Sequence, residues 1–283
     1  DLLGEVGGSN IKVVGEIGNE GSFIYSLNLS INDENIYSKF PKLDPLVFDK
    51  NSFHDSSFDA FIQGDFAKLS VSQFDLLVGQ SKISGNFDVL FDRSRPQIFI
   101  DILEAEIDID SYFTDKIIST DETDWSPEWP GSLIQYNLLD LIDLKLSVNS
   151  KKFTLFDTSI ENSKFIAEIK GGDLSVGPFT GDLFKGKLNA TLSASREEIP
   201  KINLFLSIKD ADITDAPKIP FIISPTTGVL ELILDINAEG ESVRELASNI
   251  DGKLDIKLEE GNLVGLNFSN LFQDILDLKN ITG

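Results

Sequence analysis

The side chains that could do chemistry in this chain are few in kind. Its 283 residues include no cysteine, which excludes disulfides, thiolate metal ligands and thiol nucleophiles. They include one histidine, His54, which lies beside serines and Asp55 in the polar stretch 51–57. A Ser-His-Asp triad is assembled in space from separate elements, and no second feature of the sequence supports one. We therefore interpret His54 as an exposed loop residue and expect the protein not to be an enzyme.

Carboxylates are the commonest ionisable groups, since 47 acidic residues accompany 24 basic ones and the formal net charge is −23. The acids at 104–110 alternate with apolar residues, which is typical of the solvated face of a strand rather than of a glycosidase site. The acidic segment 121–124 lacks the spacing of an EF-hand calcium loop. We expect no metal and no cofactor. Because so acidic a chain repels phosphate backbones, we also expect no nucleic-acid partner.

The alternation of apolar and polar residues is the most informative pattern in the chain. Between Pro200 and Ala238, two stretches carry an apolar residue at every second position, with exceptions at Phe205 and Ile233. A period of two gives a strand one apolar and one polar face. Similar stretches recur along most of the chain, separated by turn residues, as in antiparallel hairpins. The sequence therefore predicts a long antiparallel sheet whose apolar face must be covered by protein or by lipid.

The expected strands occupy most of the chain. They are 11–17, 22–31, 58–66, 68–78, 82–91, 97–109, 143–149, 152–157, 163–169, 173–176, 181–194, 202–209, 230–238 and 253–259. Short helices are expected at 33–40, 133–141, 242–250 and 268–278, and Ser242 with Glu245 forms a capping box in the third. A Trp- and Pro-rich acidic connector, 119–132, divides the chain into an N-terminal β segment, 1–118, and a C-terminal β segment, 133–283.

Four segments resemble the AsmA family of bacterial envelope proteins. They are 79–112, which starts at Gly79-Gln80-Ser81; 125–148, which starts at Trp125-Ser126-Pro127; 182–188; and 240–266, which starts at Gly240-Glu241-Ser242. Their order and spacing carry the resemblance. It implies an incomplete, taco-like β-barrel with a hydrophobic groove, held in the inner membrane by an N-terminal helix and projecting into the periplasm.

Together these observations predict a mainly β, antiparallel, open curved sheet with a few short helices. The chain does not start with methionine, and no apolar run approaches the roughly 20 residues of a membrane span. These features indicate a mature or excised fragment, and the resemblance implies that it is a periplasmic portion of a protein whose N-terminal inner-membrane anchor is missing from this sequence.

The resemblance implies passive transport of phospholipid between the inner and outer membranes, in support of outer-membrane biogenesis. In this interpretation acyl chains lie in the groove and headgroups face water. The expected partners are phospholipid, the inner membrane and other envelope proteins. The residues expected to line the groove are Ile83, Phe87, Val89, Ile98, Ile100, Ile102, Ile202, Leu204, Leu206, Ile208, Leu230, Leu232, Leu234, Ile236, Leu254, Ile256 and Leu258.

Two alternatives stay open. The same apolar stripes could form the closed core of a β-sandwich. The protein would then be a non-enzymatic structural or interaction module of the cell envelope that assists outer-membrane protein assembly and binds partners by strand addition. The more distant alternative is an acidic secreted enzyme that acts on glycans.

Overall fold

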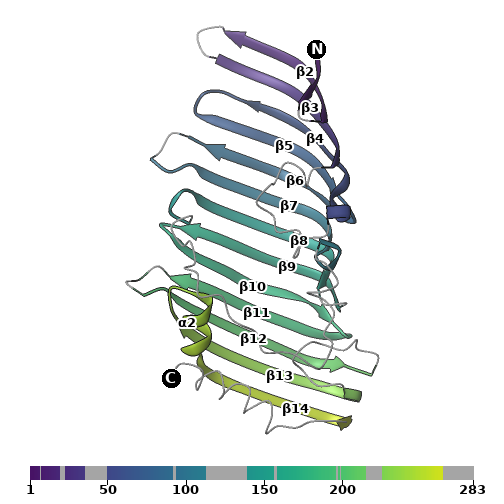
Figure 1. Cartoon of the computed structure of the whole chain (residues 1–283), viewed down its shortest axis with the longest axis vertical. Coiled ribbons are helices and arrows are strands. Elements are labelled where there is room, and N and C mark those ends of the chain that lie inside the picture. Colours follow the sequence, from purple (N-terminus) through teal and green to yellow (C-terminus); the bar gives the residue numbers. More distant parts are fainter. Residues whose placement is uncertain are drawn as a thin grey trace. The chain divides into compact units, whose positions relative to one another are not determined.

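The computed structural model describes residues 1–6, 8–19, 23–35, 50–91, 94–112, 139–155, 158–195, 197, 199–214 and 225–263. Within these ranges fourteen strands belong to one sheet, and their order across the sheet is their order along the chain (Figure 1). The end strands β1 (Leu2–Val6) and β14 (Asp251–Leu263) are not neighbours, so the sheet is open. The mainly β, open-sheet prediction is confirmed. The chain divides into two compact units.

The first unit comprises residues 1–120 and 141–167. After β1 it contains β2 (Ser9–Asn19), β3 (Phe23–Asn35), β4 (His54–Gly64), β5 (Lys68–Val78), β6 (Ser81–Leu90), β7 (Gln97–Asp108), β8 (Asp143–Leu155) and most of β9 (Thr158–Lys170). A single-turn 3₁₀ helix, η2 (Lys50–Phe53), directly precedes β4, and another, η3 (Asp110–Tyr112), follows β7. Neighbouring strands from β1 to β7 run antiparallel, whereas β7 and β8 pair in parallel.

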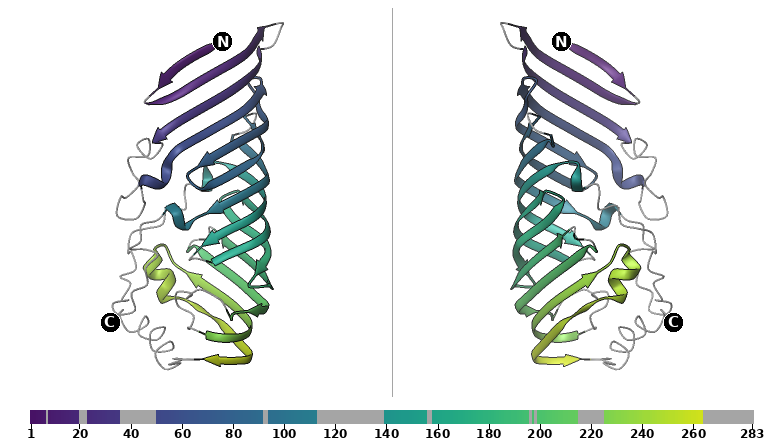
Figure 2. Two further views of the ribbon diagram at one scale, coloured as in Figure 1. Left: turned by 90° about the vertical axis from the view of Figure 1, so that its right-hand side faces the viewer. Right: turned by 90° about the vertical axis from the view of Figure 1, so that its left-hand side faces the viewer.

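The second unit comprises residues 121–140 and 168–283. Its described strands after β9 are β10 (Asp173–Leu183), β11 (Gly186–Ser195), β12 (Lys201–Asp212), β13 (Pro225–Glu239) and β14, and each pairs antiparallel with the next. The helix α2 (Val243–Ser248) lies between β13 and β14 in the chain. Within each unit the strands twist and bend along their length (Figure 2).

Bulges keep the apolar residues on one face where the strict alternation breaks. In β5, Val71 lies opposite Phe87 and Phe74 lies opposite Gly85, so the two intervening polar residues form a bulge. The same occurs in β12, where Ile208 and Ala211 both face the partner strand in register. A bulge inserts an extra residue and resets the phase of the alternation. In these two strands, a pair of adjacent polar residues between apolar ones marks the bulge.

The capping box predicted for the helix near 242–250 is present with one difference. Ser242 is the N-cap, and its hydroxyl accepts a hydrogen bond from the N–H of Glu245 at 3.2 Å. The Glu245 carboxylate accepts from the N–H of Glu241, at 2.8 Å, one residue before the cap. Two N–H groups at the start of the helix therefore donate hydrogen bonds to side-chain oxygen atoms of the protein itself.

Four local predictions are wrong. The stretch 181–194 is two strands, because Phe184 and Lys185 adopt φ values of 48° and 64° and form a tight turn without the usual Gly, Asn or Asp. The stretch 143–149 and the described part of 152–157 belong to one strand, β8, which ends at Leu155. In this strand the buried hydroxyl of Ser150 lies 2.9 Å from the carbonyl oxygens of both Ala105 and Lys152. His54 is exposed, as expected, but it is the first residue of strand β4 and not a loop residue. Residues 33–35, which were expected to begin a helix, are the last three residues of strand β3.

The remaining expectations at 36–40, 119–132, 133–138 and 268–278 fall outside the described residues. The division of the chain at the acidic connector 119–132 therefore stays a prediction.

The described core cluster of the first unit lies on one face of its sheet. Ala60, Val71 and Phe74 form its buried centre. The side chains packed against them are Phe58, Ile62, Leu69, Leu76, Ile83, Phe87 and Ile102. The ring centroid of Phe74 lies 6.0 Å from that of Phe58 and 5.9 Å from that of Phe87. All members come from the consecutive strands β4 to β7, so they pack sideways on one face of one sheet.

Candidate functional site

One face of the second unit is apolar across consecutive strands. A row of directly opposite residues runs from Ala190 on β11 through Leu206 and Leu234 to Leu254 on β14. Residues directly opposite each other in antiparallel strands share a face. The neighbouring rows are Leu192–Leu204–Ile236 and Leu188–Ile208–Leu232–Ile256. The register therefore joins the alternating stripes of four strands into one surface.

This surface is covered unevenly. At the end where β12 finishes and β13 begins, Ile208, Leu230 and Leu232 are only 9%, 8% and 2% exposed. In the middle, four side chains are half-buried and a fifth, Leu254, is 43% exposed. These five, which we call the open patch, are Leu204, Leu206, Leu234, Ile236 and Leu254. The buried end stabilises the fold, whereas the open patch presents apolar area that could contact a ligand.

The first unit has a comparable apolar face, which extends from β2 to β8. One row of directly opposite residues runs Val13–Leu29–Ala60–Phe74–Gly85–Ile102–Val148. A second row beside it runs Gly15–Leu27–Ile62–Val71–Phe87–Ile100–Leu146. Phe87 and Ile100 are half-buried, whereas Val71 is 1% exposed. Half-buried and buried apolar side chains thus share this face too.

The residues predicted to line a groove all lie on these two faces. In the first unit, Phe87 faces Ile100, Val89 faces Ile98, Ile102 faces Gly85, and Ile83 faces Ala105. In the second unit they fill β12, β13 and β14, where Ile202 faces Ala238 and Leu258 faces Leu230. The prediction left out β1 to β5 and β8 to β11, although Val13, Leu29, Leu146 and Leu192 show the same alternation and could have been found by it.

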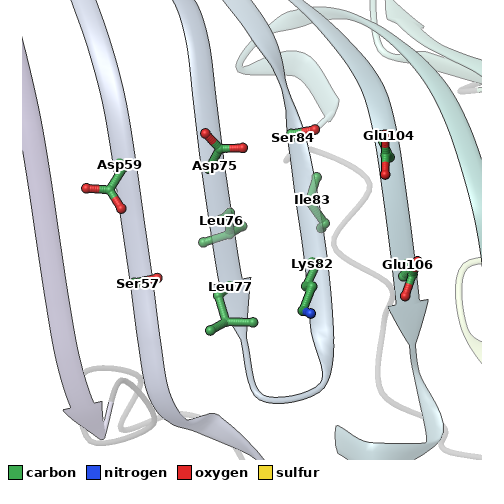
Figure 3. Close-up of a pocket in the computed structure, with 10 residues that line it drawn as sticks. All are labelled: Ser57, Asp59, Asp75, Leu76, Leu77, Lys82, Ile83, Ser84, Glu104 and Glu106. Carbon is green, nitrogen blue, oxygen red and sulfur yellow. The ribbon is translucent and has the colours of Figure 1, made fainter.

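The opposite, polar face of the first unit carries a shallow depression of about 340 Å³ between β4 and β7 (Figure 3). Its lining is Ser57, Asp59, Asp75, Leu76, Leu77, Lys82, Ile83, Ser84, Glu104 and Glu106. Asp59 lies directly opposite Asp75, and like charges in this position are unfavourable. Among the described residues no three acidic or histidine side chains are placed to hold a metal ion.

Several lysines on the described strands and turns form ion pairs with carboxylates. Lys151 binds Glu104, and Lys68 lies 3.1 Å from Asp88. In the second unit the Lys185 ammonium lies 2.8 Å from the Asp212 carboxylate. This hydrogen bond, with those from Thr214, lowers the pKa of Asp212 to about 2. Such exposed pairs fix local geometry and contribute little to stability.

Comparison with known proteins places the chain in a family. The sequence profile of the AsmA family matches residues 116–281, which include β8 to β14. Three of the four segments that carry the resemblance lie inside this range, whereas 79–112 lies outside it. No curated protein and no solved structure matches the chain significantly. None of the helices in the described part of the chain is long and apolar enough to cross a bilayer. Because the matched residues make up more than half of the 283, the chain belongs to the AsmA family.

Proposed function

We propose that this protein binds phospholipid in the periplasm by laying the acyl chains against its apolar sheet faces, and that it supports lipid transfer between the inner and outer membranes. The observation that carries the proposal is the register, which joins the apolar stripes of consecutive strands into one face in each unit. Family membership favours a role in the cell envelope.

The energetics of such binding need no specific polar contact. Each methylene moved from water to an apolar surface contributes about 0.8 kcal/mol. The half-buried side chains of the open patch offer area that a closed core would have removed from water. In this mechanism the protein shields the tails while the headgroup stays in water, and no side chain is catalytic.

A single sheet favours this proposal over a β-sandwich. The described strands form one sheet in sequential order, and the core cluster of the first unit lies on one face of β4 to β7. A sandwich would place the apolar face of a second sheet about 10 Å away. Its inner side chains would then be buried along their whole length, unlike Leu206 and Leu234.

A second candidate function rests on the edge of the sheet. β1 has one neighbour in the described sheet, and its Leu2 and Leu3 are 73% and 78% exposed. An unpaired edge can bind an extended segment of another protein through main-chain hydrogen bonds. This favours an interaction module that binds other envelope proteins. It is compatible with lipid binding, since the edge and the apolar face are different surfaces.

Native mass spectrometry of freshly purified protein tests the proposal. We expect additional masses that match diacyl phospholipids and disappear after delipidation. Reloading from vesicles should restore them. Protein that carries no lipid after purification and takes up none from vesicles would refute lipid binding, and the interaction module would remain. Periplasmic location and attachment to the inner membrane are proposals as well, which fractionation of cells expressing the full-length protein would check.

A further inference from the structure

Exposed apolar side chains gather at one end of the strands in the first unit. This is the end where β2, β4 and β6 finish and where β3, β5, β7 and β8 begin, on the left in Figure 1. Five large apolar residues here, which we call the hairpin-tip rim, are 50–80% exposed: Ile17, Ile24, Phe66, Phe91 and Leu141. Among the side chains that the structure describes, the opposite strand ends of this unit carry none of this kind and exposure. Single exposed apolar residues are common, but five at the same end of one sheet mark a contact surface.

The hairpin-tip rim adjoins the apolar face of the same unit. A third row of directly opposite residues on that face runs Ile17–Tyr25–Gly64–Leu69–Val89–Ile98–Leu144. The rim residues Phe66, Phe91 and Leu141 lie two or three positions along the chain from members of this row. Apolar surface therefore continues from the face of the sheet to the rim.

Backbone groups at the two phenylalanine tips are hydrogen-bonded within the protein. The Asp65 carboxylate accepts hydrogen bonds from the N–H groups of Ala67 and Lys68, at 2.7 and 2.9 Å, and these bonds close the turn around Phe66. The Phe91 N–H donates to the Ala67 carbonyl at 2.8 Å, which holds the β4–β5 and β6–β7 tips side by side. Because these polar groups are satisfied by the protein, the tips lose less free energy when they leave water.

The exposed side chains of the β2–β3 hairpin lie on both faces of the sheet. Ile17 lies opposite Tyr25 and belongs to the apolar row. Ile24 is the next residue before Tyr25, opposite Gly18, and is therefore on the polar face. A protein that packs against one face would leave one of these isoleucines in water, whereas a bilayer surrounds an inserted tip on every side. The geometry of this hairpin therefore favours lipid over a protein surface.

We propose that the hairpin-tip rim docks on a phospholipid bilayer, with its side chains inserted between the headgroups. The driving force is the transfer of these apolar side chains out of water. The formal net charge of −23 opposes docking on anionic lipid, so the preferred surface is zwitterionic. The inference rests on the proposed lipid-binding function for its purpose, because docking brings the apolar face of the first unit next to acyl chains in the membrane.

A label on a single cysteine tests which strand end enters the bilayer, since the chain has no cysteine of its own. Ala67→Cys places an environment-sensitive nitrobenzoxadiazole label beside Phe66, and Gln80→Cys places it in the β5–β6 turn at the opposite strand end. With phosphatidylcholine vesicles we expect brighter, blue-shifted emission from the Ala67→Cys label and an unchanged spectrum from the Gln80→Cys label. A shift at both positions, at neither, or only at Gln80→Cys overturns the docking of this rim.

Matched double variants measure the contribution of the two phenylalanines. Phe66→Ser with Phe91→Ser should lower partitioning onto phosphatidylcholine vesicles, measured by flotation, by about tenfold or more. Phe205→Ser with Ile233→Ser removes two exposed apolar side chains from the polar face of β12 and β13, and it should leave partitioning nearly unchanged. Replacing part of the phosphatidylcholine by phosphatidylglycerol should not strengthen binding. Thermal unfolding checks that both variants remain folded.

Three results would overturn the inference. The first is equal flotation of the unaltered protein and both double variants. The second is binding that requires phosphatidylglycerol and disappears in ~1 M salt, because such binding is electrostatic. The third is self-association in sedimentation velocity that is lost in Phe66→Ser with Phe91→Ser while the unaltered protein does not float, because the rim would then be an interface between copies of this chain.

Native mass spectrometry of the same samples separates this inference from the lipid-binding function. Protein that takes up phospholipid from the vesicles but neither floats with them nor shows the label shift overturns the docking alone. Protein that docks through the rim and takes up no phospholipid supports the docking and overturns lipid binding.

Discussion

Replacing Leu206 by glutamate should weaken lipid binding by roughly a hundredfold while leaving the protein folded. Leu206 lies in the middle of the open patch, directly opposite Ala190 on one side and Leu234 on the other, and it is half-buried. Because the carboxylate needs water, it keeps an acyl chain away from its surroundings. The substitution thus removes one apolar position and also prevents close contact at its neighbours.

The magnitude follows from the geometry of the sheet. An acyl chain that crosses one strand, ~4.8 Å wide, lays about four methylenes on it. At about 0.8 kcal/mol each, losing these contacts weakens binding by about 3 kcal/mol, which is roughly a hundredfold in affinity. Leu206→Ala, which shortens the side chain without adding charge, should give a smaller loss.

The matched control is Asn203→Glu. Asn203 lies on the same strand with its side chain on the opposite, polar face, where it is exposed and opposite Ser193 and Asn237. The Asn203→Glu substitution adds the same carboxylate to the same strand, and this variant should load lipid like the unaltered protein. The assay is uptake of a fluorescent-tailed phospholipid from vesicles, with thermal unfolding of each lipid-free variant as the check on folding. Equal uptake by the Leu206→Glu and Asn203→Glu variants would refute the binding of tails at the open patch.

Three further predictions follow from the buried end, the helix cap and one ion pair. Leu232→Ala should lower the free energy of unfolding by about 2–5 kcal/mol, because Leu232 is 2% exposed; a chemical denaturation curve that does not move would show that this end is not packed. Ser242→Ala should cost about 1 kcal/mol through loss of the N-cap and speed hydrogen exchange at Glu245, and unchanged exchange there would contradict the cap. The pKa of Asp212, lowered to about 2, should return towards its ordinary value of 3.8 in Lys185→Ala; the sign follows because a depressed folded-state pKa stabilises above pH ~4 and this contribution fades as pH falls through ~2. A carboxyl NMR titration measures it, and an Asp212 that titrates alike in both proteins would contradict the pairing.

Strands were predictable from the sequence because their signal is local. Alternation over a few residues identified nearly every described strand, and β5 was placed at its observed bounds, Lys68–Val78. Where the local signal was atypical, prediction failed. At the turn, Phe184 and Lys185 adopt left-handed backbone conformations that residues other than Gly, Asn and Asp rarely adopt. The hydrogen bonds formed when β10 pairs with β11 offset the cost of this conformation.

Long-range features were beyond the reach of pattern reasoning. The parallel pairing of β7 with β8 joins Ile98 to Leu144, and no local spacing encodes a partner so far along the chain. The uneven cover of the second unit was also missed. Leu206 and Leu232 occupy equivalent positions in their alternating stripes, yet one is half-buried and the other is 2% exposed. Burial depends on what the folded chain places over a residue, whereas alternation specifies only the face.

The sequential order of the strands has a consequence for how this protein can evolve. Because each described strand has as neighbours only those adjacent to it in the chain, a duplicated or deleted hairpin would be accommodated by re-pairing two edges. A globular enzyme would have to rebuild its interior after such an event. Here an even number of strands can enter or leave while the in–out phase of every remaining residue is retained. Gene duplication or deletion can therefore widen or narrow the apolar face one hairpin at a time, without a compensating substitution elsewhere.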